Sequence, residues 1–437
     1  MMRGRSVWTN WARTERVRPV RVERPASIVE VQRLIRAAAG AGLPIKAVGA
    51  GHSFTGIAVA PGVLLELDAL SGVVRVDRER RRVTLRAGTR LHDVPRLLEP
   101  YGLAMPNLGD IDRQSIAGAI STGTHGTGSA FGGIATQVVG VVLVTADGEL
   151  LTADDEQETA LLPALALGLG ALGILVEVTL QCVPAFVLHA VERPEPLDGL
   201  LSELLARAAA VDHFEFYWFP HTGTALTKTN VRLPGDSAVR PLRPLERWVD
   251  DTLLANGVYR VLCNVGTVAP AIVPGVNRLA DRLVGDREFV DRSTAVFTTS
   301  RTVRFVEMEY AVPLEQLPTA FAKVRALIEE RGWRISFPIE VRVAASDELW
   351  LSTASGRATG YVAVHRFFRE DPGEYFRAVE AIMTELGGRP HWGKLHGRNA
   401  SSLRGAYPHF DDFLALRYRL DPGRVFGNPY LTRVLGE

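Results

Sequence analysis

The chain has 437 residues, of which 46% are apolar and 23% are charged, so it has enough material for two packed domains. Fifty basic residues stand against 49 acidic ones, and the formal charge of +1 excludes the overall positive field that draws nucleic acid or an anionic membrane. With two cysteines, Cys182 and Cys263, a disulfide framework or a cysteine-based metal site is not expected, which is typical of a cytoplasmic protein.

The first predicted elements are a helix and a strand that lead into a glycine turn. Ser27 and Glu30 have the spacing of a capping box, and apolar residues recur at helical spacing from position 28 to position 38. Residues 43–48 then predict a short buried strand, which delivers the chain into Gly49-Ala50-Gly51-His52-Ser53. The glycine turn is therefore expected directly after a strand.

The next predicted elements are rich in β-structure. Residues 63–67, 73–76 and 83–88 have the composition of strands, and a second helix is expected to begin near Leu91. The basic run 78–86 has no interleaved aromatic residues, so it predicts a solvated hairpin rather than a nucleic-acid patch.

Later elements complete this domain and begin another. Residues 138–150 alternate like a strand and close on a hairpin turn. The uncharged stretch 159–176 approaches the length of a membrane span, but its proline and glycines favour a helix, a turn and a buried strand. After Pro184 the composition becomes more aromatic, and strand-like runs at 303–310 and 341–343 predict a second domain that covers a substrate.

Two glycine-rich segments predict a cofactor site. In a nicotinamide-binding fingerprint the third glycine would fall at position 54, which is Phe54. The first glycine turn is therefore not expected to bind a nicotinamide dinucleotide. The second segment, 114–128, is dense in small and hydroxyl residues, which let backbone N–H groups approach phosphates and add neutral donors without a lysine. Two such loops predict one extended dinucleotide.

The residues Glu340 and Arg342 lie two apart in an alternating run, so both side chains are expected on one face of a strand. A solvated ion pair on an edge strand is the alternative that this pattern alone favours. His391 and His396 lack the acidic support of a metal site, so no metal is expected, and no Gly-x-Ser-x-Gly elbow is present for acyl transfer.

Together with Arg389-Pro390-His391-Trp392-Gly393-Lys394, Asp421-Pro422 and Phe426-x-Asn428-x-Tyr430, these motifs give the chain a resemblance over nearly its whole length. It resembles the FAD-linked oxidases of the vanillyl-alcohol-oxidase type, in the branch of sugar-1,4-lactone and alditol oxidases. The resemblance implies an α+β fold with a two-subdomain FAD-binding domain in residues 1–184 and a substrate-binding cap domain with an antiparallel sheet in residues 185–390. A C-terminal segment, 391–437, would return to complete the flavin site.

The resemblance also implies that FAD is joined covalently to His52, at the 8α position of the flavin. A hydrogen-bonded loop histidine is the alternative for His52, and a structural histidine is the alternative for His125. The cofactor-binding residues that the resemblance implies are Val48, Gly49, Ala50, Gly51, His52, Ser53, Ser115, Gly118, Ser121, Gly123, Thr124, His125, Gly126, Thr127 and Ile174.

Five residues are implied in catalysis. Arg342 would bind substrate hydroxyls and favour negative charge on the reduced flavin, and Glu340 would orient polyol groups. His365 would be the general base, with a core histidine as the alternative. Lys394 would reach the reacting carbon, with a surface lysine as the alternative, and Ser115 would contact both flavin and substrate.

The implied reaction is the oxidation of an aldono-1,4-lactone, L-gulono- or D-arabinono-1,4-lactone, to an ascorbate-type product by hydride transfer to FAD N5. Electrons would pass to oxygen or to a cytochrome c-like acceptor. An alditol oxidase acting on xylitol or sorbitol shares the same motifs and is the main alternative. A flavin- or sugar-binding protein without turnover and a nicotinamide-dependent flavin reductase are the others. We expect a cytoplasmic protein without a transmembrane segment, and peripheral attachment to a membrane stays open.

Overall fold

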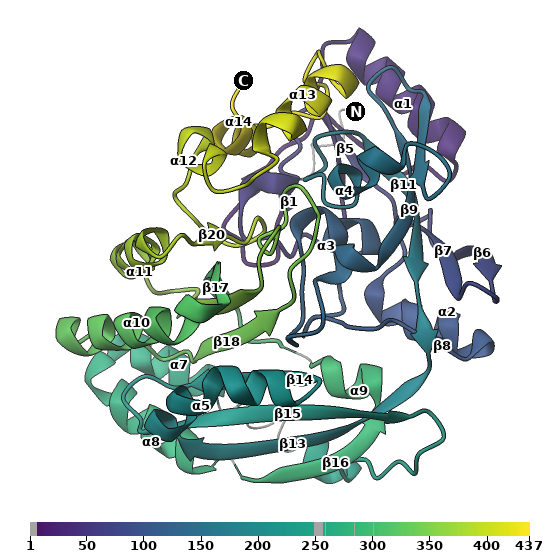
Figure 1. The fold of residues 1–437 in the computed structure, drawn as a ribbon. Coiled ribbons are helices and arrows are strands. Elements are labelled where there is room, and N and C mark those ends of the chain that lie inside the picture. Colours follow the sequence, from purple (N-terminus) through teal and green to yellow (C-terminus); the bar gives the residue numbers. More distant parts are fainter. Residues whose placement is uncertain (1–6, 249–256, 258, 284, 300) are drawn as a thin grey trace.

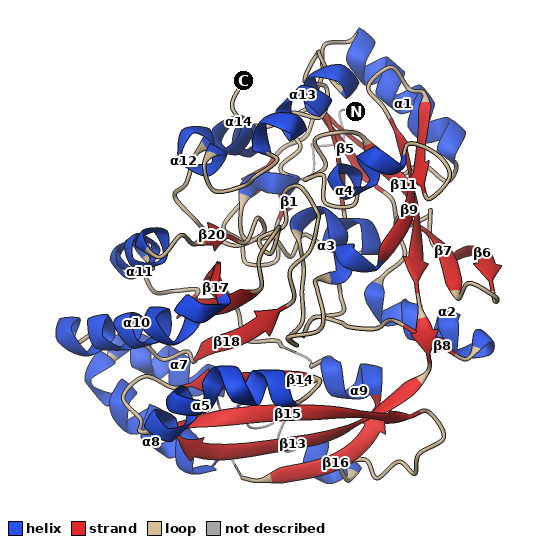
Figure 2. Cartoon of the chain, in the orientation of Figure 1, coloured by secondary structure: helices blue, strands red, loops and turns tan. Residues whose placement is uncertain are grey.

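The computed structural model describes residues 7–248, 257, 259–283, 285–299 and 301–437. Figure 1 shows an upper half that contains the early strands together with the C-terminal helices, and a lower half that is built on a large sheet from the middle of the chain. Helices and strands are mixed in both halves (Figure 2), as the α+β prediction requires.

The glycine turn follows a small parallel sheet of three strands. Its order is β3-β5-β4, and helix α1 lies between β3 and β4 in the chain. Ser27 caps α1, as predicted, by accepting a hydrogen bond from the N–H of Glu30 at 3.2 Å. The Glu30 carboxylate accepts from the N–H of Ala26 at 2.6 Å, so the reciprocal bond closes one residue earlier than a capping box predicts. The bounds are β3 (Arg21–Glu23), α1 (Ile28–Gly40), β4 (Ile45–Val48) and β5 (Val63–Glu66).

A second sheet of five antiparallel strands completes the upper half. The predicted basic hairpin is the turn between β6 and β7, and the uncharged stretch 159–176 is the predicted succession of short helix, turn and strand. The sheet order is β10-β9-β11-β7-β6. The bounds are β6 (Val73–Asp77), β7 (Arg82–Arg86), α2 (Val94–Leu98), α3 (Ile116–Thr122), β9 (Val138–Val144), β10 (Leu150–Asp154), α4 (Leu162–Leu165) and β11 (Ile174–Gln181).

The lower half is an eight-stranded sheet in which every neighbouring pair is antiparallel. Helices α5, α10 and α11 pack against it around a core of large apolar side chains. The strand runs predicted at 303–310 and 341–343 are β17 and β18, which are separated in the sheet by β19. In the order of the sheet, the bounds are β16 (Arg287–Arg292), β13 (Phe186–Pro196), β15 (Thr224–Pro234), β14 (His213–Trp218), β18 (Ile339–Ala344), β19 (Thr359–Phe367), β17 (Phe305–Pro313) and β20 (Arg389–Pro390). The helices are α5 (Leu197–Ala210), α10 (Leu317–Arg331) and α11 (Gly373–Glu385).

The C-terminal helices pack into the upper half, where they share its apolar core. Asp421 ends α13 and accepts hydrogen bonds from the N–H groups of Val425 and Phe426 at 2.7 and 2.9 Å. The side-chain amide of Asn428 lies 2.9–3.0 Å from three backbone carbonyl oxygens of the segment 56–59, just after the glycine turn. The bounds are α12 (Ala400–Arg404), α13 (Phe410–Leu420) and α14 (Pro429–Leu435).

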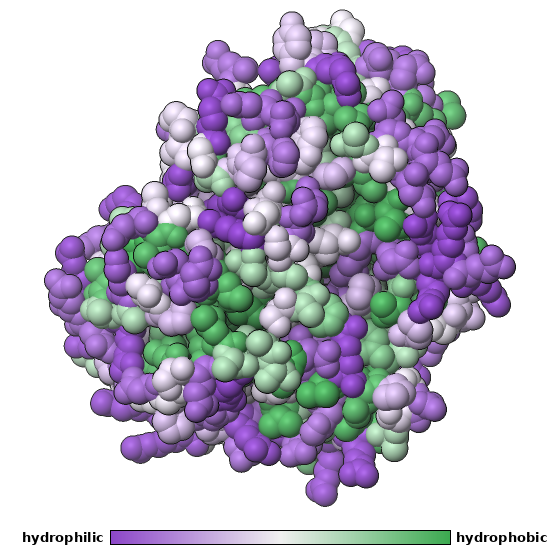
Figure 3. Space-filling view, in the orientation of Figure 1, coloured by the Kyte–Doolittle hydropathy of each residue, from purple (hydrophilic) through white to green (hydrophobic). Residues whose placement is uncertain are grey.

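The remaining described elements are short or lie at the periphery. No helix in the described ranges is both long and apolar enough to cross a bilayer. In the orientation of Figure 3, hydrophilic residues dominate the rim of the molecule. These elements are β1 (Trp8–Thr9), β2 (Arg16–Val17), β8 (Leu103–Ala104), β12 (Val183–Pro184), α6 (Pro244–Arg247), α7 (Tyr259–Val268), α8 (Val273–Leu283) and α9 (Ser293–Phe297).

Candidate functional site

Two cavities adjoin each other, one within the upper half of the molecule and one between the two halves. The first lies between the glycine turn and α3, and the second lies between the turn and the large sheet. They contain about 930 and 970 Å³ of space free of protein atoms, part of which is open to solvent. Four residues line both cavities, so the two adjoin: His52, Ser53, Gln114 and Thr122.

The two predicted glycine-rich loops meet in the first cavity. Gly51 has a φ of +67°, a conformation that favours glycine. Gly49 lies so close to Ser115 that a Cβ at position 49 would overlap the Ser115 Oγ. The Ser115 Oγ also caps α3, because it accepts a hydrogen bond from the N–H of Gly118 at 3.2 Å. The loops therefore form one continuous cradle.

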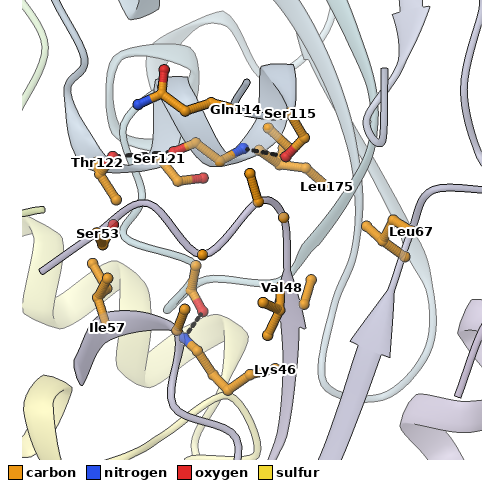
Figure 4. A pocket seen from close by; sticks show the side chains of 18 of the residues that line it. Lys46, Val48, Ser53, Ile57, Leu67, Gln114, Ser115, Ser121, Thr122 and Leu175 are labelled. Atoms are coloured by element: carbon orange, nitrogen blue, oxygen red, sulfur yellow. Dashed lines mark hydrogen bonds between the residues drawn. The ribbon is translucent and has the colours of Figure 1, made fainter. Parts of the chain in front are cut away.

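Most of the predicted cofactor residues surround this cradle. In Figure 4, Gln114, Ser115, Ser121 and Thr122 lie on one side of the pocket, and Lys46, Val48, Ser53 and Ile57 lie on the other. The predicted residues that line the first cavity are Val48, Gly49, Ala50, Gly51, His52, Ser53, Ser115, Gly118, Ser121 and Ile174, and those that line the second alone are Thr124 and His125.

Three predicted cofactor residues line neither cavity, and each has a structural position. Gly123 ends α3 in the left-handed conformation, with a φ of +78°. Gly126 lies against the backbone of Leu108, where any Cβ would overlap the carbonyl oxygen. The Thr127 hydroxyl donates to the carbonyl of Phe214 and accepts from the N–H of Val343. This hydroxyl joins the loop to the large sheet.

A lysine lines the first cavity, although the sequence predicted a cradle without one. Lys46 on β4 donates to the carbonyl oxygens of Gly170 at 2.8 Å and Phe426 at 3.2 Å. Burial, followed by the charge of Arg417, lowers the pKa of Lys46 to about 7. The ammonium thus connects the glycine turn, the loop before β11 and the C-terminal segment.

Strand β18 points Glu340 and Arg342 into the second cavity, as the alternating pattern predicted. Arg342 forms ion pairs with Glu340 and with Glu215, whose carboxylate lies 2.7 Å from the Arg342 Nε. The hydroxyl of Tyr217 lies 3.2 Å from Glu340. Burial alone would lower the pKa of Arg342, but Glu340 and Glu215 outweigh it and hold that pKa well above its usual value. The pair is a buried network, not a solvated ion pair.

Strand β17 contributes two buried carboxylates that the sequence prediction missed, Glu307 and Glu309. Glu307 forms an ion pair with Lys394, and its other oxygen lies 3.6 Å from the His365 Nε2. Burial would raise the pKa of Glu307, but Lys394 and His365 lower it to about 2. Lys394 is therefore held inside the cavity as half of an ion pair.

A group of three side chains gathers around the second of these carboxylates. The His125 Nε2 lies 3.3 Å from Glu309, and the ring of His125 stacks on Tyr361 with centroids 3.7 Å apart. His391 lies close enough for one ligand atom from each of His125, Glu309 and His391 to fall within 4.8 Å of the others. The His391 Nδ1 accepts from the N–H of Gly393 at 3.0 Å, which leaves its Nε2 protonated in the neutral ring. This tautomer favours a hydrogen-bonded group over a metal site.

A further ion pair that the sequence did not reveal also lines this cavity. Arg301 and Asp110 approach to 2.6 Å, and both line the cavity. Burial would raise the pKa of Asp110, but Arg301 and Arg342 outweigh it and lower that pKa to about 2. The cavity wall is therefore built from compensated charges and offers many fixed polar groups to a neutral substrate.

His52 lies where the cavities adjoin. Its ring makes an edge contact with Trp11, with centroids 5.7 Å apart, and no hydrogen bond to its ring nitrogens is present among the described residues. Burial, Lys394 and Arg90 lower the pKa of His52 to about 4. The imidazole is therefore neutral near pH 7 and keeps a free lone pair.

Comparison with known proteins identifies the family. A family model described as D-arabinono-1,4-lactone oxidase matches residues 178–434, and one described as an FAD binding domain matches residues 19–154. The chain belongs to the D-arabinono-1,4-lactone oxidase family. It is 42% identical to a Mycobacterium tuberculosis protein named L-gulono-1,4-lactone dehydrogenase, over 98% of this chain and 99% of that protein.

Two further proteins extend the comparison. The chain is 33% identical to the alditol oxidase of a Streptomyces species, over 98% of each chain. A variant of cholesterol oxidase from Brevibacterium sterolicum has the same fold, with a TM-score of 0.82 and 18% identity over 98% of this chain and 96% of that one. The vanillyl-alcohol-oxidase-type fold that the sequence predicted is confirmed, and the cofactor is FAD.

The residues of the first cavity fit FAD. The cradle is open because its glycines carry no side chains, and the hydroxyls of Ser121 and Thr122 border it. The buried Oε1 of Gln114, a residue that lines both cavities, has no hydrogen-bond partner among the described residues. A buried acceptor without a partner is costly, so a bound polar group that donates a hydrogen bond is expected here.

Replacing Gly49 by alanine in this family member is expected to reduce the flavin content of the purified protein at least severalfold. The new methyl group would displace the Ser115 Oγ, which breaks the cap of α3 at a cost of about 1 kcal/mol and narrows the cradle. The ratio of flavin to protein absorbance measures the loss. Gly199→Ala in α5 is the matched control, because no heavy atom lies within 4 Å of its added methyl group. Equal flavin content in both variants would contradict the prediction.

Proposed function

We propose that this protein oxidises an aldono-1,4-lactone, L-gulono- or D-arabinono-1,4-lactone, to an ascorbate-type product. One observation carries the proposal. Glu340, Arg342, His365 and Lys394 come from two strands and a loop, and they converge on a cavity that adjoins the FAD cradle at His52. The names of the family model and of the M. tuberculosis relative support a lactone as the substrate.

In the proposed reaction each of these residues has a separate role. His365 takes the proton of the substrate hydroxyl, and Lys394 holds the oxygen of the reacting carbon. Arg342, fixed by two carboxylates, donates to substrate hydroxyls, and Glu340 orients the substrate beside it. Ser115 lies at the flavin cavity as the cap of α3. The glycine cradle would hold FAD, which would supply the hydride-accepting chemistry of the reaction at its N5.

We propose that the FAD is joined covalently to His52. The neutral imidazole, its free lone pair and its place where the cavities adjoin support this assignment. The link would hold the flavin ring between the cradle and the substrate cavity. We further divide the chain into an FAD-binding domain (1–184), a cap domain (185–390) and a C-terminal segment (391–437).

An alditol oxidase is the second candidate, favoured by the Streptomyces relative of that name. The wall of compensated ion pairs, Arg301 with Asp110 and Arg342 with Glu340, suits an open-chain polyol as well as a lactone ring. The acceptor of the electrons is proposed to be oxygen or a cytochrome c-like protein, because the family model is named for an oxidase and the M. tuberculosis relative for a dehydrogenase.

One experiment tests substrate and acceptor together. The purified protein is mixed without oxygen with L-gulono-1,4-lactone, D-arabinono-1,4-lactone or xylitol, and the flavin absorbance is followed. A lactone is expected to bleach the flavin fastest, and air or cytochrome c then restores the colour. Faster bleaching by xylitol would favour the alditol oxidase, and bleaching by NADPH alone would favour a reductase. A protein without flavin would refute the proposal.

We propose a cytoplasmic protein that attaches to anionic membrane surfaces through α7 and α8. Among the described residues, eight of the seventeen exposed large apolar side chains lie between positions 239 and 279. Three of them, Val261, Val265 and Val268, form one stripe of α7, and the exposed Arg278 on α8 supplies positive charge. Apolar side chains with basic neighbours are typical of peripheral membrane contacts.

Vesicle sedimentation tests this attachment. Binding to vesicles that contain phosphatidylserine is expected, with weaker binding to pure phosphatidylcholine, because only the anionic lipid attracts the positive charge of Arg278. Val265→Asp is expected to reduce the bound fraction severalfold, and Val74→Asp, another exposed valine outside the patch, serves as the control. Equal binding by both variants would refute the assigned surface.

A further inference from the structure

Glu307 has two different partners, one for each carboxylate oxygen. Its Oε2 forms the ion pair with Lys394, and its Oε1 lies 3.6 Å from the Nε2 of His365. The residue is 5% exposed and lies in a strand whose neighbouring positions are apolar. A buried carboxylate is costly unless it is paired, so its retention here indicates that both partners matter.

The hydrogen bonding of His365 decides which of its nitrogens can take a proton. The Nδ1 lies 2.9 Å from the carbonyl oxygen of Pro338. A carbonyl oxygen only accepts, so Nδ1 carries a proton, and in the neutral ring Nε2 carries none. The one nitrogen of His365 that is free to gain a proton is therefore the nitrogen beside Glu307.

We propose that Glu307 is a positioning residue of the oxidation, which fixes Lys394 in the cavity and stabilises the proton that His365 gains at Nε2. The inference rests on the proposed function, in which His365 is the base. In that step the proton of the substrate hydroxyl passes to the His365 Nε2. A hydride leaves the carbon that bears this hydroxyl for FAD, and the carbon–oxygen single bond becomes a carbonyl. Glu307 acts through its two partners and needs no contact with the substrate.

The other charges near His365 are already compensated. Glu309, two residues along β17, pairs with His125, and Glu340 on the adjacent strand β18 pairs with Arg342. His52 is neutral near pH 7, since burial and then Lys394 lower its pKa to about 4, and burial lowers the pKa of His391 to about 3. The rings of Phe305 and Phe337 lie against His365, with centroids 5.2 and 6.2 Å away. The charges nearest to the His365 Nε2 are therefore those of Glu307 and of Lys394, which pairs with Glu307.

The dependence of kcat/KM on pH tests this balance. Because free His365 must be unprotonated to act, activity rises with pH along an acid limb. Glu307→Gln removes the attraction and is expected to move this limb about one to two pH units lower. It should also lower kcat on the plateau by about 100-fold, with a smaller effect on KM, because His365 becomes a weaker base and Lys394 loses its anchor.

The variant Lys394→Met tests a shift of the acid limb in the opposite direction. Removing the ammonium is expected to move the acid limb to higher pH, and the double variant Glu307→Gln/Lys394→Met should return it close to the parent position. A purely structural role for Glu307 would lower activity without these opposed shifts. Glu307→Asp, which keeps the charge, is expected to retain the parent limb with a reduced kcat.

Glu309→Gln is the matched control, because Glu309 lies on the same face of the same strand and is 4% exposed. The acid limb of kcat/KM should move less in Glu309→Gln than in Glu307→Gln. Flavin content and thermal unfolding confirm that each variant is folded, and Glu307→Asp provides the readout if the amide variant is not. The inference would be overturned if the acid limb of kcat/KM did not move in Glu307→Gln, or if it moved equally in Glu309→Gln. In either case the flavin of the parent protein would still be bleached by substrate, so the proposed function would stand. A parent that no lactone or polyol bleaches would overturn the proposed function and this inference with it.

Discussion

Replacing Arg342 by methionine is expected to lower kcat/KM for the lactone by about 10²- to 10³-fold, the typical effect of losing a charge-stabilising donor. The arginine is the cation between Glu215 and Glu340, so methionine leaves the buried Glu340 and the half-buried Glu215 without this counter-charge. Breaking a buried pair costs about 3–5 kcal/mol of folding stability. Steady-state kinetics and thermal unfolding of the same preparation measure both effects.

Arg342→Lys is the matched control for the methionine variant. Lysine keeps the positive charge but cannot reproduce the fork with which Arg342 contacts Glu215, Glu340 and the hydroxyl of Tyr217. It is therefore expected to recover most of the stability and only part of the activity. Retention of activity within tenfold of the parent in Arg342→Met would show that Arg342 has no part in the reaction.

Replacing His52 by alanine is expected to convert acid-stable flavin into flavin that acid releases. Trichloroacetic acid should leave the parent pellet yellow, whereas the His52→Ala pellet should be colourless and its supernatant yellow. The cradle of glycines and hydroxyls is intact in this variant, so it should still bind FAD without the link. The mass of the intact chain provides a second measurement.

Ser53→Ala controls for the local disturbance, because Ser53 is the next residue in the turn and lines both cavities. Its pellet is expected to stay yellow. If the His52→Ala pellet also keeps its colour, the flavin is attached elsewhere, and the assignment of the link to His52 is wrong.

The features that the sequence predicted best are those encoded by neighbouring residues. The strand before the glycine turn, the cap of α1 by Ser27 and the basic hairpin all depend on contacts within a few residues. The alternation that placed Glu340 and Arg342 on one face is equally local. Such patterns determine the backbone of the cradle, so its course could be predicted from the amino-acid order alone.

The partners of these residues could not be predicted in the same way. Glu215 and Tyr217 reach Arg342 across more than 120 positions of the chain, and Asp110 meets Arg301 across 191. No periodicity connects residues so far apart. One missed pair did leave a local signal, because Glu307 and Glu309 alternate with apolar residues in a strand that is otherwise buried. Lys46, which the sequence prediction also missed, left a similar local signal, because it is a charged residue within a predicted buried strand.

The contacts of the C-terminal segment have a consequence for biosynthesis. Lys46 bonds to a carbonyl 380 residues further along the chain, and Asn428 holds the carbonyls of the segment just after the glycine turn. A nascent chain therefore emerges from the ribosome with β4 and the turn long before their packing partners exist. Contacts so distant in sequence form slowly, because a long loop must first be closed. The cradle is expected to capture FAD only after translation has passed α14, so unfinished chains would remain free of flavin.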